Sequence, residues 1–263
     1  MQISGSTVLL TGATGGIGHA IARALGGRGA KLILTGRRSE VLEPLAAELG
    51  ARTLTVDLSD RAAVDQLALD AGDADILIAN AALPATGTLD SFSLEEIDRA
   101  LDVNLRAPIV LARALTPRMT ERGRGHLVFI SSLSGKAASP RTAMYNTSKF
   151  GLRGLSGALR ADLHGTGVGV SAIFPGFISD AGMFADAGVT LPPGIGTKTP
   201  EDVAAAVVKA IERNRAELDV APLGLRGGTV FASLAPQLAA RVARKLGSED
   251  ITRQMHDGQR DKR

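Results

Sequence analysis

Three side chains of the sequence have the types and the spacing that proton transfer requires. Tyr145 is the only tyrosine in the chain, it follows Ser132 by thirteen residues, and Lys149 follows it by four. Residues four apart share a helix face, so the Lys149 ammonium would lie beside the Tyr145 phenol. A nearby ammonium favours phenolate and lowers the phenol pKa from its usual value near 10. Ser132 could hold a substrate oxygen, although a tyrosine four residues before a lysine is by itself more often structural.

A glycine-rich turn lies near the start of the chain. A short apolar run ends in Thr11-Gly12-Ala13-Thr14-Gly15-Gly16-Ile17-Gly18, which leads into a helical pattern. Glycines let a pyrophosphate approach the backbone, and a helix N-terminus supplies unpaired N–H groups. A turn at the first β–α crossover is where dinucleotides bind in such sheets. The spacing G-x-x-x-G-x-G differs from the common G-x-G-x-x-G, and an ordinary turn is the alternative.

Two arginines follow the second apolar run, in Leu34-Thr35-Gly36-Arg37-Arg38. An acidic residue here would bind the ribose 2′-hydroxyl of NAD, and none is present. A guanidinium group matches the geometry of a 2′-phosphate. The pair therefore predicts NADP as the cofactor, with NAD less favoured, and solvated loop charges are the alternative.

The apolar pattern predicts the elements that position these residues. Near-continuous apolar runs, typical of strands buried on both faces, cover 7–11, 30–35, 52–56, 75–79, 125–131, 168–174 and 217–221. Helical patterns lie between them at 17–25, 40–49, 62–69, 94–122, 143–164 and 199–214, and Pro108 is expected to break the longest. The alternation predicts an α/β fold, a single doubly wound Rossmann-type domain with a central parallel sheet of about seven strands and helices on both faces.

Residues 1–228 are expected to form the cofactor-binding and catalytic domain, with a substrate loop at about 177–198, and residues 229–263 a C-terminal helix and basic tail. An apolar stripe at helical spacing runs through 229–247, with Pro236 as a possible start, and consists of Phe231, Leu234, Leu238, Val242 and Leu246. Such a stripe packs on its own subunit or a partner more often than on a membrane. Residues 241–263 carry seven Lys or Arg and four Asp or Glu, which predicts a frayed, solvated terminus.

Composition excludes several classes of site. The 263 residues include no cysteine, so disulfides, cysteine nucleophiles and thiolate-bound metals are ruled out, and no metal is expected. No secretory signal is recognised, and no apolar run approaches the ~20 residues of a spanning helix, so a cytoplasmic location is expected. Arginines do not alternate with aromatic residues as in nucleic-acid modules.

On these motifs the chain resembles the classical short-chain dehydrogenase/reductase family over about residues 5–222. Beyond the glycine turn and the serine, tyrosine and lysine, the matching residues are Asp57, Asn80-Ala81, Asn104 and Pro175-Gly176. The resemblance implies that Tyr145 is the acid/base, that Ser132 orients the substrate oxygen, and that Lys149 lowers the tyrosine pKa and binds the nicotinamide ribose. It also implies that Asn104 holds a water of a proton relay through its helix-distorting backbone.

The resemblance further implies a cofactor site in which Asp57 contacts the adenine amino group, Asn80 shapes the cleft floor and Pro175-Gly176 borders the nicotinamide. The complete expected set is Gly12, Thr14, Gly15, Gly16, Ile17, Gly18, Arg37, Arg38, Asp57, Leu58, Asn80, Ala81, Tyr145, Lys149, Pro175, Gly176 and Ile178. Two positions depart from the family pattern: Ala82 replaces a usual Gly, and Asp180 replaces a frequent Thr.

The expected reaction is NADP-dependent hydride transfer between nicotinamide and a carbonyl or secondary alcohol of an apolar substrate, which is lipid-like, steroid, terpenoid or acyl. The expected catalytic residues are Asn104, Ser132, Tyr145 and Lys149, and the expected substrate residues are Ser132, Leu133, Tyr145, Phe177, Met183 and Phe184. The resemblance implies a homodimer or homotetramer. The alternatives are a non-catalytic NADP-binding regulatory or scaffold protein, a peripheral membrane protein, and another doubly wound enzyme such as an epimerase or methyltransferase.

Overall fold

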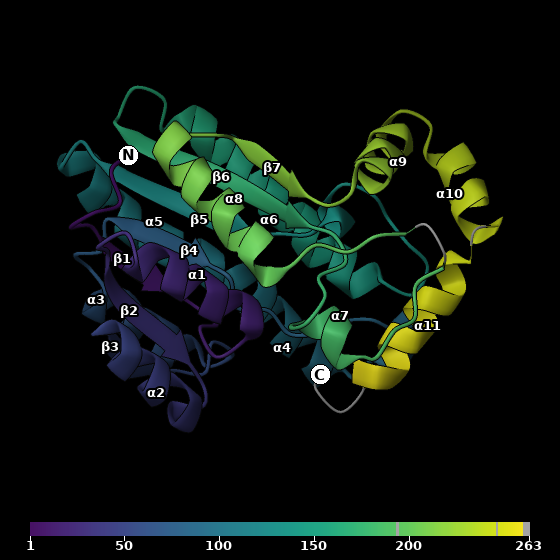
Figure 1. Ribbon diagram of the computed structural model, residues 1–263, viewed down its shortest axis with the longest axis horizontal. Helices are drawn as coiled ribbons and strands as arrows, with labels where there is room; N and C mark the ends of the chain where they lie inside the picture. Colours follow the sequence, from purple (N-terminus) through teal and green to yellow (C-terminus); the bar gives the residue numbers. More distant parts are fainter. Residues whose placement is uncertain (193–194, 246, 260–263) are drawn as a thin grey trace.

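A parallel sheet forms the centre of the molecule (Figure 1). The computed structural model describes residues 1–192, 195–245 and 247–259. The strands run in the order β3-β2-β1-β4-β5-β6-β7, with bounds β1 (Thr7–Leu10), β2 (Lys31–Gly36), β3 (Arg52–Thr55), β4 (Ile76–Ala79), β5 (Gly125–Ile130), β6 (Val168–Pro175) and β7 (Glu217–Val220). The doubly wound α/β prediction is confirmed. Strand order reverses between β1 and β4, so their carboxyl ends border the crevice where ligands bind in such sheets.

Helices cover both faces of the sheet. The bounds are α1 (Gly16–Gly26), α2 (Ser39–Leu49), α3 (Arg61–Asp70), α4 (Leu94–Leu101), α5 (Ala107–Glu121), α6 (Ala143–Asp162), α7 (Met183–Asp186), α8 (Pro200–Arg213), α9 (Leu223–Leu234), α10 (Pro236–Lys245) and α11 (Ser248–Gln259), with the short segments η1 (Leu89–Ser91), η2 (Asp102–Arg106) and η3 (Leu133–Gly135). One hydrophobic cluster joins α1, α2 and α8 to the sheet, and a second joins α3, α5 and α6 to its other face.

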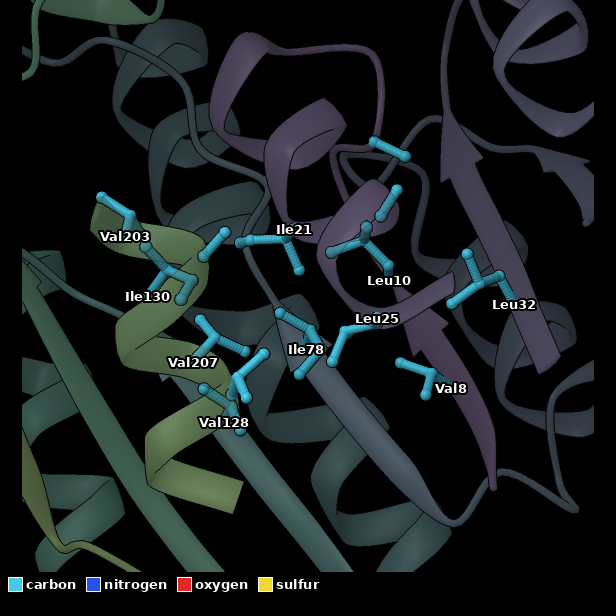
Figure 2. Packing of buried hydrophobic residues seen from close by; sticks show 14 of the residues in the cluster. Val8, Leu10, Ile21, Leu25, Leu32, Ile78, Val128, Ile130, Val203 and Val207 are labelled. Carbon is cyan, nitrogen blue, oxygen red and sulfur yellow. The ribbon is translucent and has the colours of Figure 1, made fainter. Parts of the chain in front are cut away.

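Alternation along each strand supplies both clusters. In β1, Val8 and Leu10 enter the cluster beneath α1 and α8, whereas Leu9 enters the opposite one. Figure 2 shows the first cluster, where Ile21 of α1 and Val207 of α8 meet the strand side chains. Each fully buried aliphatic side chain stabilises the fold by about 1.5–3 kcal/mol. The packing therefore holds the strand ends, and the loops that leave them, in a rigid frame.

The long helix expected over 94–122 is interrupted. A π-helical segment, η2, separates α4 from α5, and the Ala107 N–H donates to the carbonyl five residues back, at Asp102. Pro108 lies in the first turn of α5 rather than at the break itself. Proline has no N–H, so Pro108 cannot donate to the carbonyl of Asn104 four residues before it. The missing bond explains why the interruption precedes the proline.

The C-terminal region differs from its prediction. A single helix over 229–247 is wrong, because α9 ends at Leu234, while the alternative of a helix that starts at Pro236 is confirmed, since α10 begins there. Ala235 between them has φ −137° and ψ 66°, since a residue before proline is disfavoured in the helical conformation. The solvated tail is also wrong over Ser248–Gln259, which form α11, while residues 260–263 and Leu246 lie outside the described residues. None of the helices in the described ranges is long and apolar enough to cross a bilayer.

Candidate active site

The glycine turn lies where β1 leads into α1 and leaves no room for side chains. Gly12 has φ +66°, and a Cβ atom there would lie 2.7 Å from the Ala81 Cα. A Cβ atom at Gly16 would overlap that of Ala181, and one at Gly18 would overlap the Gly12 carbonyl oxygen. The turn therefore approaches two other loops closely, and its backbone stays accessible to a ligand at the helix N-terminus.

Asn80 joins the ends of β4 and β1. Its side-chain amide donates to the carbonyls of Thr11, at 3.1 Å, and Gly12, at 3.0 Å. The Thr11 hydroxyl in turn accepts from the backbone N–H groups of Asn80 and Ala81, both at 3.1 Å. These bonds close the crevice floor at the point where strand order reverses. Ala82 is outside the left-handed region of φ, so alanine fits its backbone without strain where the family usually has glycine.

Arg37, Arg38 and Asp57 lie at the ends of β2 and β3, beside the glycine turn. Both arginines are exposed, and Arg38 donates to the Thr14 carbonyl at 3.2 Å. Burial opposes ionisation of Asp57, but hydrogen bonds from the Ser59 N–H and hydroxyl, with the charge of Arg37, outweigh it and lower the Asp57 pKa. The arrangement places two cations and one carboxylate at the outer end of the crevice.

Ser132, Tyr145 and Lys149 are brought together from the end of β5 and the start of α6. A hydrogen bond links the side chains of Ser132 and Tyr145, and the Ser132 hydroxyl also donates weakly to the Pro175 carbonyl, at 3.4 Å. The Lys149 Nζ lies 5.5 Å from the centre of the Tyr145 ring and donates to the Ile130 carbonyl at 3.0 Å. Tyr145 and Lys149 thus share a helix face, as their spacing predicts.

The proton affinities differ from the prediction. Burial raises the pKa of Tyr145 to about 12, and the Ser132 hydrogen bond opposes that rise only in part. Burial also lowers the pKa of Lys149 to about 8. The pKa of Tyr145 is therefore raised rather than lowered, because desolvation of the phenolate is the largest influence on it.

Asn104 lies in the π-helical segment η2 and is almost fully buried. Its side chain donates to the Leu83 carbonyl at 2.9 Å and accepts from the Leu83 N–H at 2.6 Å. The amide therefore pairs both backbone groups of a residue in the loop that follows β4. Its distorted backbone agrees with the family expectation, while its side chain positions the crevice loop.

The loop after β6 contacts the glycine turn. Gly176 bonds to the Val220 carbonyl through its N–H at 3.0 Å, Ile178 is buried, and Ala181 packs directly on Gly16. Asp180 has φ +66° and accepts from the Ser179 hydroxyl at 2.7 Å. The loop thus places Asp180 immediately before the residue that touches the turn.

The remaining expected residues occupy different positions. Leu58 is buried in a core cluster, so only its backbone is available to a ligand, and Ile17 packs partly against the other cluster. The rings of Phe177 and Phe184 lie 5.0 Å apart, centre to centre. Leu133 packs beside Gly176, and the Met183 carbonyl accepts from Gln259 at 2.6 Å.

One residue and one helix on the substrate side had not been singled out, although the segment after β7 was expected there together with residues 133–139 and the loop 177–198. Leu225 of α9 joins Leu133 beside Gly176. Helix α11 spans the substrate side, because His256 contacts the Thr86 carbonyl at 2.9 Å while Gln254 accepts from the Thr190 N–H at 3.0 Å. Glu249 and Asp250 in its first turn are the signal for a helix start that could have revealed it.

Among the described residues, no three His, Asp or Glu side chains are grouped so that they could hold a metal ion.

Known proteins resemble the chain over most of its length. The family model described as short chain dehydrogenase matches residues 6–190. A ketoacyl reductase, HetN of Nostoc sp., is 39% identical over 227 residues, which are 83% of this chain and 79% of that protein. Dehydrogenase/reductase SDR family member 7B of Xenopus laevis is 33% identical over 258 residues, with 90% and 80% covered.

Solved structures agree with these relatives. A short-chain dehydrogenase from Sphingobium yanoikuyae in complex with NADPH has a TM-score of 0.77 at 27% identity and covers 89% of this chain and 95% of its own. A metagenomic short-chain oxidoreductase in complex with NADP has a TM-score of 0.70 at 32% identity, with 84% and 97% covered. By its matched motifs, its fold and these relatives, the chain belongs to the short-chain dehydrogenase family of NAD(P)-dependent oxidoreductases.

Proposed function

We propose that the protein is an NADP-dependent oxidoreductase that reduces the carbonyl of an apolar, acyl-type substrate, with Tyr145 as the general acid. The observation that carries the proposal is the convergence of Ser132, Tyr145 and Lys149 at the carboxyl edge of the sheet. Binding of the cofactor alone does not require the hydroxyl groups of Ser132 and Tyr145 to lie close to the buried Lys149 ammonium.

The crevice fits NADP. Gly12 and Gly16 are packed against Ala81 and Ala181, whereas Gly15 at the N-terminus of α1 has only the Gly12 carbonyl oxygen nearby, 3.7 Å from the position of a Cβ atom, so the helix N-terminus is open to a phosphate. Arg37 and Arg38 are the groups to hold a 2′-phosphate, with Asp57 towards the adenine. Three of the similar solved structures are described as complexes with NADP, NADP+ or NADPH, which supports this choice. When bound, the cofactor supplies the hydride.

The residues of the chain supply and direct the proton. With a pKa of about 12, Tyr145 is protonated at neutral pH and can donate its phenolic proton to the substrate oxygen. Ser132 orients that oxygen through a second hydrogen bond. Lys149, with a pKa of about 8, carries its positive charge at pH 7 and stabilises the phenolate that remains. Reduction is therefore favoured near neutrality, and alcohol oxidation accelerates as pH rises.

An apolar substrate suits the lining of the site. Leu133, Phe177, Phe184 and Leu225 surround the end of β6 with few polar groups. The relative named as a ketoacyl reductase supports an acyl chain attached to the carbonyl. The proposal keeps residues 1–228 as the cofactor-binding and catalytic domain, and α11 completes the substrate side.

The proposal includes a homodimer or homotetramer assembled through α5 and α6. Ile109 of α5 and Phe150 of α6 are large apolar side chains that remain exposed in the single chain. Their burial against a second copy would account for them.

The test compares wild-type protein with Tyr145→Phe, using a fluorescence titration with NADPH and with NADH and then turnover of medium-chain keto esters. We expect NADPH to bind more tightly than NADH, and Tyr145→Phe to keep NADPH affinity while losing about 10²–10⁴-fold in kcat. Thr147→Ala, an exposed position on the same helix, is the matched control and should keep its activity. Equal turnover by Tyr145→Phe would contradict the acid role, and tight NADPH binding without turnover of any ketone would favour the non-catalytic alternative.

A further inference from the structure

Helices α9 and α10 carry large apolar side chains that are exposed to the outside. Six of the eleven large apolar side chains exposed in the described part of the chain lie on these two helices, and Leu223 and Leu234 keep 80% and 81% of their surface exposed. We call this surface the α9–α10 face, formed by Leu223, Val230, Phe231, Leu234, Leu238 and Val242. A patch of this kind on a single chain marks an interaction site.

The face is carried by a part of the molecule that stands off from the sheet. Figure 1 shows α9 and α10 at one end of the molecule, beyond β7 and next to α11. On α9, Leu225 points towards the site, where it lies beside Gly176. At 3.6 residues per turn, Leu223 and Leu234 lie on roughly the opposite side of the helix from Leu225. The exposed face is therefore distinct from the lining of the substrate site.

The charge around the face has one sign. Residues 223–245 contain Arg226, Arg241, Arg244 and Lys245 and no Asp or Glu. Within the described residues, none of these four cations is in an ion pair with a carboxylate. Two acidic residues begin α11 nearby, and one of them, Asp250, pairs with Arg253 instead. The face therefore carries uncompensated positive charge.

The cations flank the apolar side chains. On the helical wheel of α10, Lys245 and Arg241 lie within about 60° of Leu238, and Arg226 lies at a similar angle from Leu223 on α9. Long basic side chains in this position can extend to headgroups while their stems cover apolar surface. This is the pattern of helices that lie in a membrane interface with anionic lipids.

A second copy of the chain is a poorer occupant. A two-fold interface pairs a surface with itself, so the four cations of one copy would find no Asp or Glu within residues 223–245 of the other. Such an interface would lack charge complementarity and would gather positive charge on both sides, which is unfavourable. An anionic lipid surface complements both the charge and the apolar side chains.

We propose that the α9–α10 face docks the protein on the surface of an anionic lipid bilayer, with Leu234 and Leu238 inserted and Arg241, Arg244 and Lys245 on the headgroups. Docking there places the bilayer on the side of α9 opposite Leu225, so the substrate site faces away from the lipid across that helix. The inference does not depend on the reaction, since binding to lipid is measured without turnover.

The experiment is vesicle co-sedimentation of the full chain with phosphatidylcholine vesicles, with and without phosphatidylglycerol. Wild-type protein should sediment with the anionic vesicles, much less with neutral ones, and less as NaCl is raised. The double change Leu234→Glu and Leu238→Glu should weaken binding on the order of 100-fold. Arg241→Gln with Arg244→Gln should weaken it about 30-fold, because each basic residue near an anionic surface contributes about 1 kcal/mol.

The matched control is Leu69→Glu with Leu94→Glu, which adds the same two charges at exposed leucines of α3 and α4. The control should bind vesicles like wild type, and NADPH titration should show that every variant keeps its fold. Wild-type protein that stays in solution with anionic vesicles would overturn the proposal. An equal loss of vesicle binding in Leu234→Glu/Leu238→Glu and in the control Leu69→Glu/Leu94→Glu would also overturn it. A molar mass by light scattering that halves in Leu234→Glu/Leu238→Glu, without any vesicle binding by wild type, would assign the face to a second copy instead.

Discussion

Asn104 offers the sharpest test of how the crevice is held. Its side chain is 1% exposed and pairs the N–H and the carbonyl of Leu83, which is itself buried. Asn104→Ala removes both partners at once and leaves two buried backbone groups unsatisfied. Each such group costs about 1–3 kcal/mol, and partial entry of water places the total at about 2–4 kcal/mol.

The lost free energy of unfolding corresponds to a fall in the melting temperature. An unfolding entropy of about 2.1 cal/mol/K per residue gives a chain of 263 residues about 0.55 kcal/mol/K. A loss of about 2–4 kcal/mol then corresponds to a fall in Tm of roughly 4–7 °C. The Kd for NADPH should rise as well, because the loop that Leu83 anchors also contains Asn80 and Ala81.

Differential scanning calorimetry with and without NADPH measures both effects. Gln66→Ala is the control, since its side chain makes one exposed hydrogen bond, to Asp70, and its removal should change the free energy of unfolding by less than about 0.5 kcal/mol. A Tm for Asn104→Ala within about 1 °C of wild type would refute the reasoning, because the two bonds to Leu83 would then contribute nothing in solution.

Three further outcomes are expected. Gly16→Val should raise the NADPH Kd at least tenfold, or about 1.4 kcal/mol, because the valine side chain would overlap the loop after β6. The control is Gly157→Ala, which has open space around it and should bind NADPH normally in the same titration. Burial lowers the pKa of His126 to about 3, so the side chain stays neutral in the folded chain. In the unfolded chain the same imidazole binds a proton below about pH 6.5. Stability should therefore fall as pH drops from 6.5, by about 2 kcal/mol at pH 5, and His126→Gln should remove that part of the slope in urea titrations. Gly258→Leu should raise KM for the carbonyl substrate without changing NADPH affinity. A Cβ atom at this position would lie 2.5 Å from the Ala187 carbonyl oxygen, so the leucine would push α11 away from the substrate loop.

Each outcome has a clear contrary result. Normal NADPH binding by Gly16→Val would mean that Ala181 moves aside, and an unchanged pH slope in His126→Gln would assign the acid sensitivity to carboxylates. An equal change in KM and NADPH affinity for Gly258→Leu would show that α11 supports the whole fold and not the substrate side alone.

Much of the scaffold could be read from the sequence, because it depends on local pattern. Apolar runs buried on both faces predict parallel strands, and Ser93 and Thr199 cap α4 and α8 with the residues three positions later. The glycine turn and the spacing of Tyr145 and Lys149 were visible for the same reason, since a strand end and one turn of helix fix their geometry.

The tertiary structure decided what depends on distant neighbours. Desolvation, which comes from every element packed around Tyr145, raises its pKa where the adjacent lysine alone would lower it. The pairing of Asn104 with Leu83 joins positions 21 residues apart. Helix α11 has few apolar residues and gains its place by bonds to Thr86, Met183 and Thr190, so composition alone made it resemble a solvated tail. Local chemistry follows from residue order, but burial and long-range pairing exist only once the chain has folded.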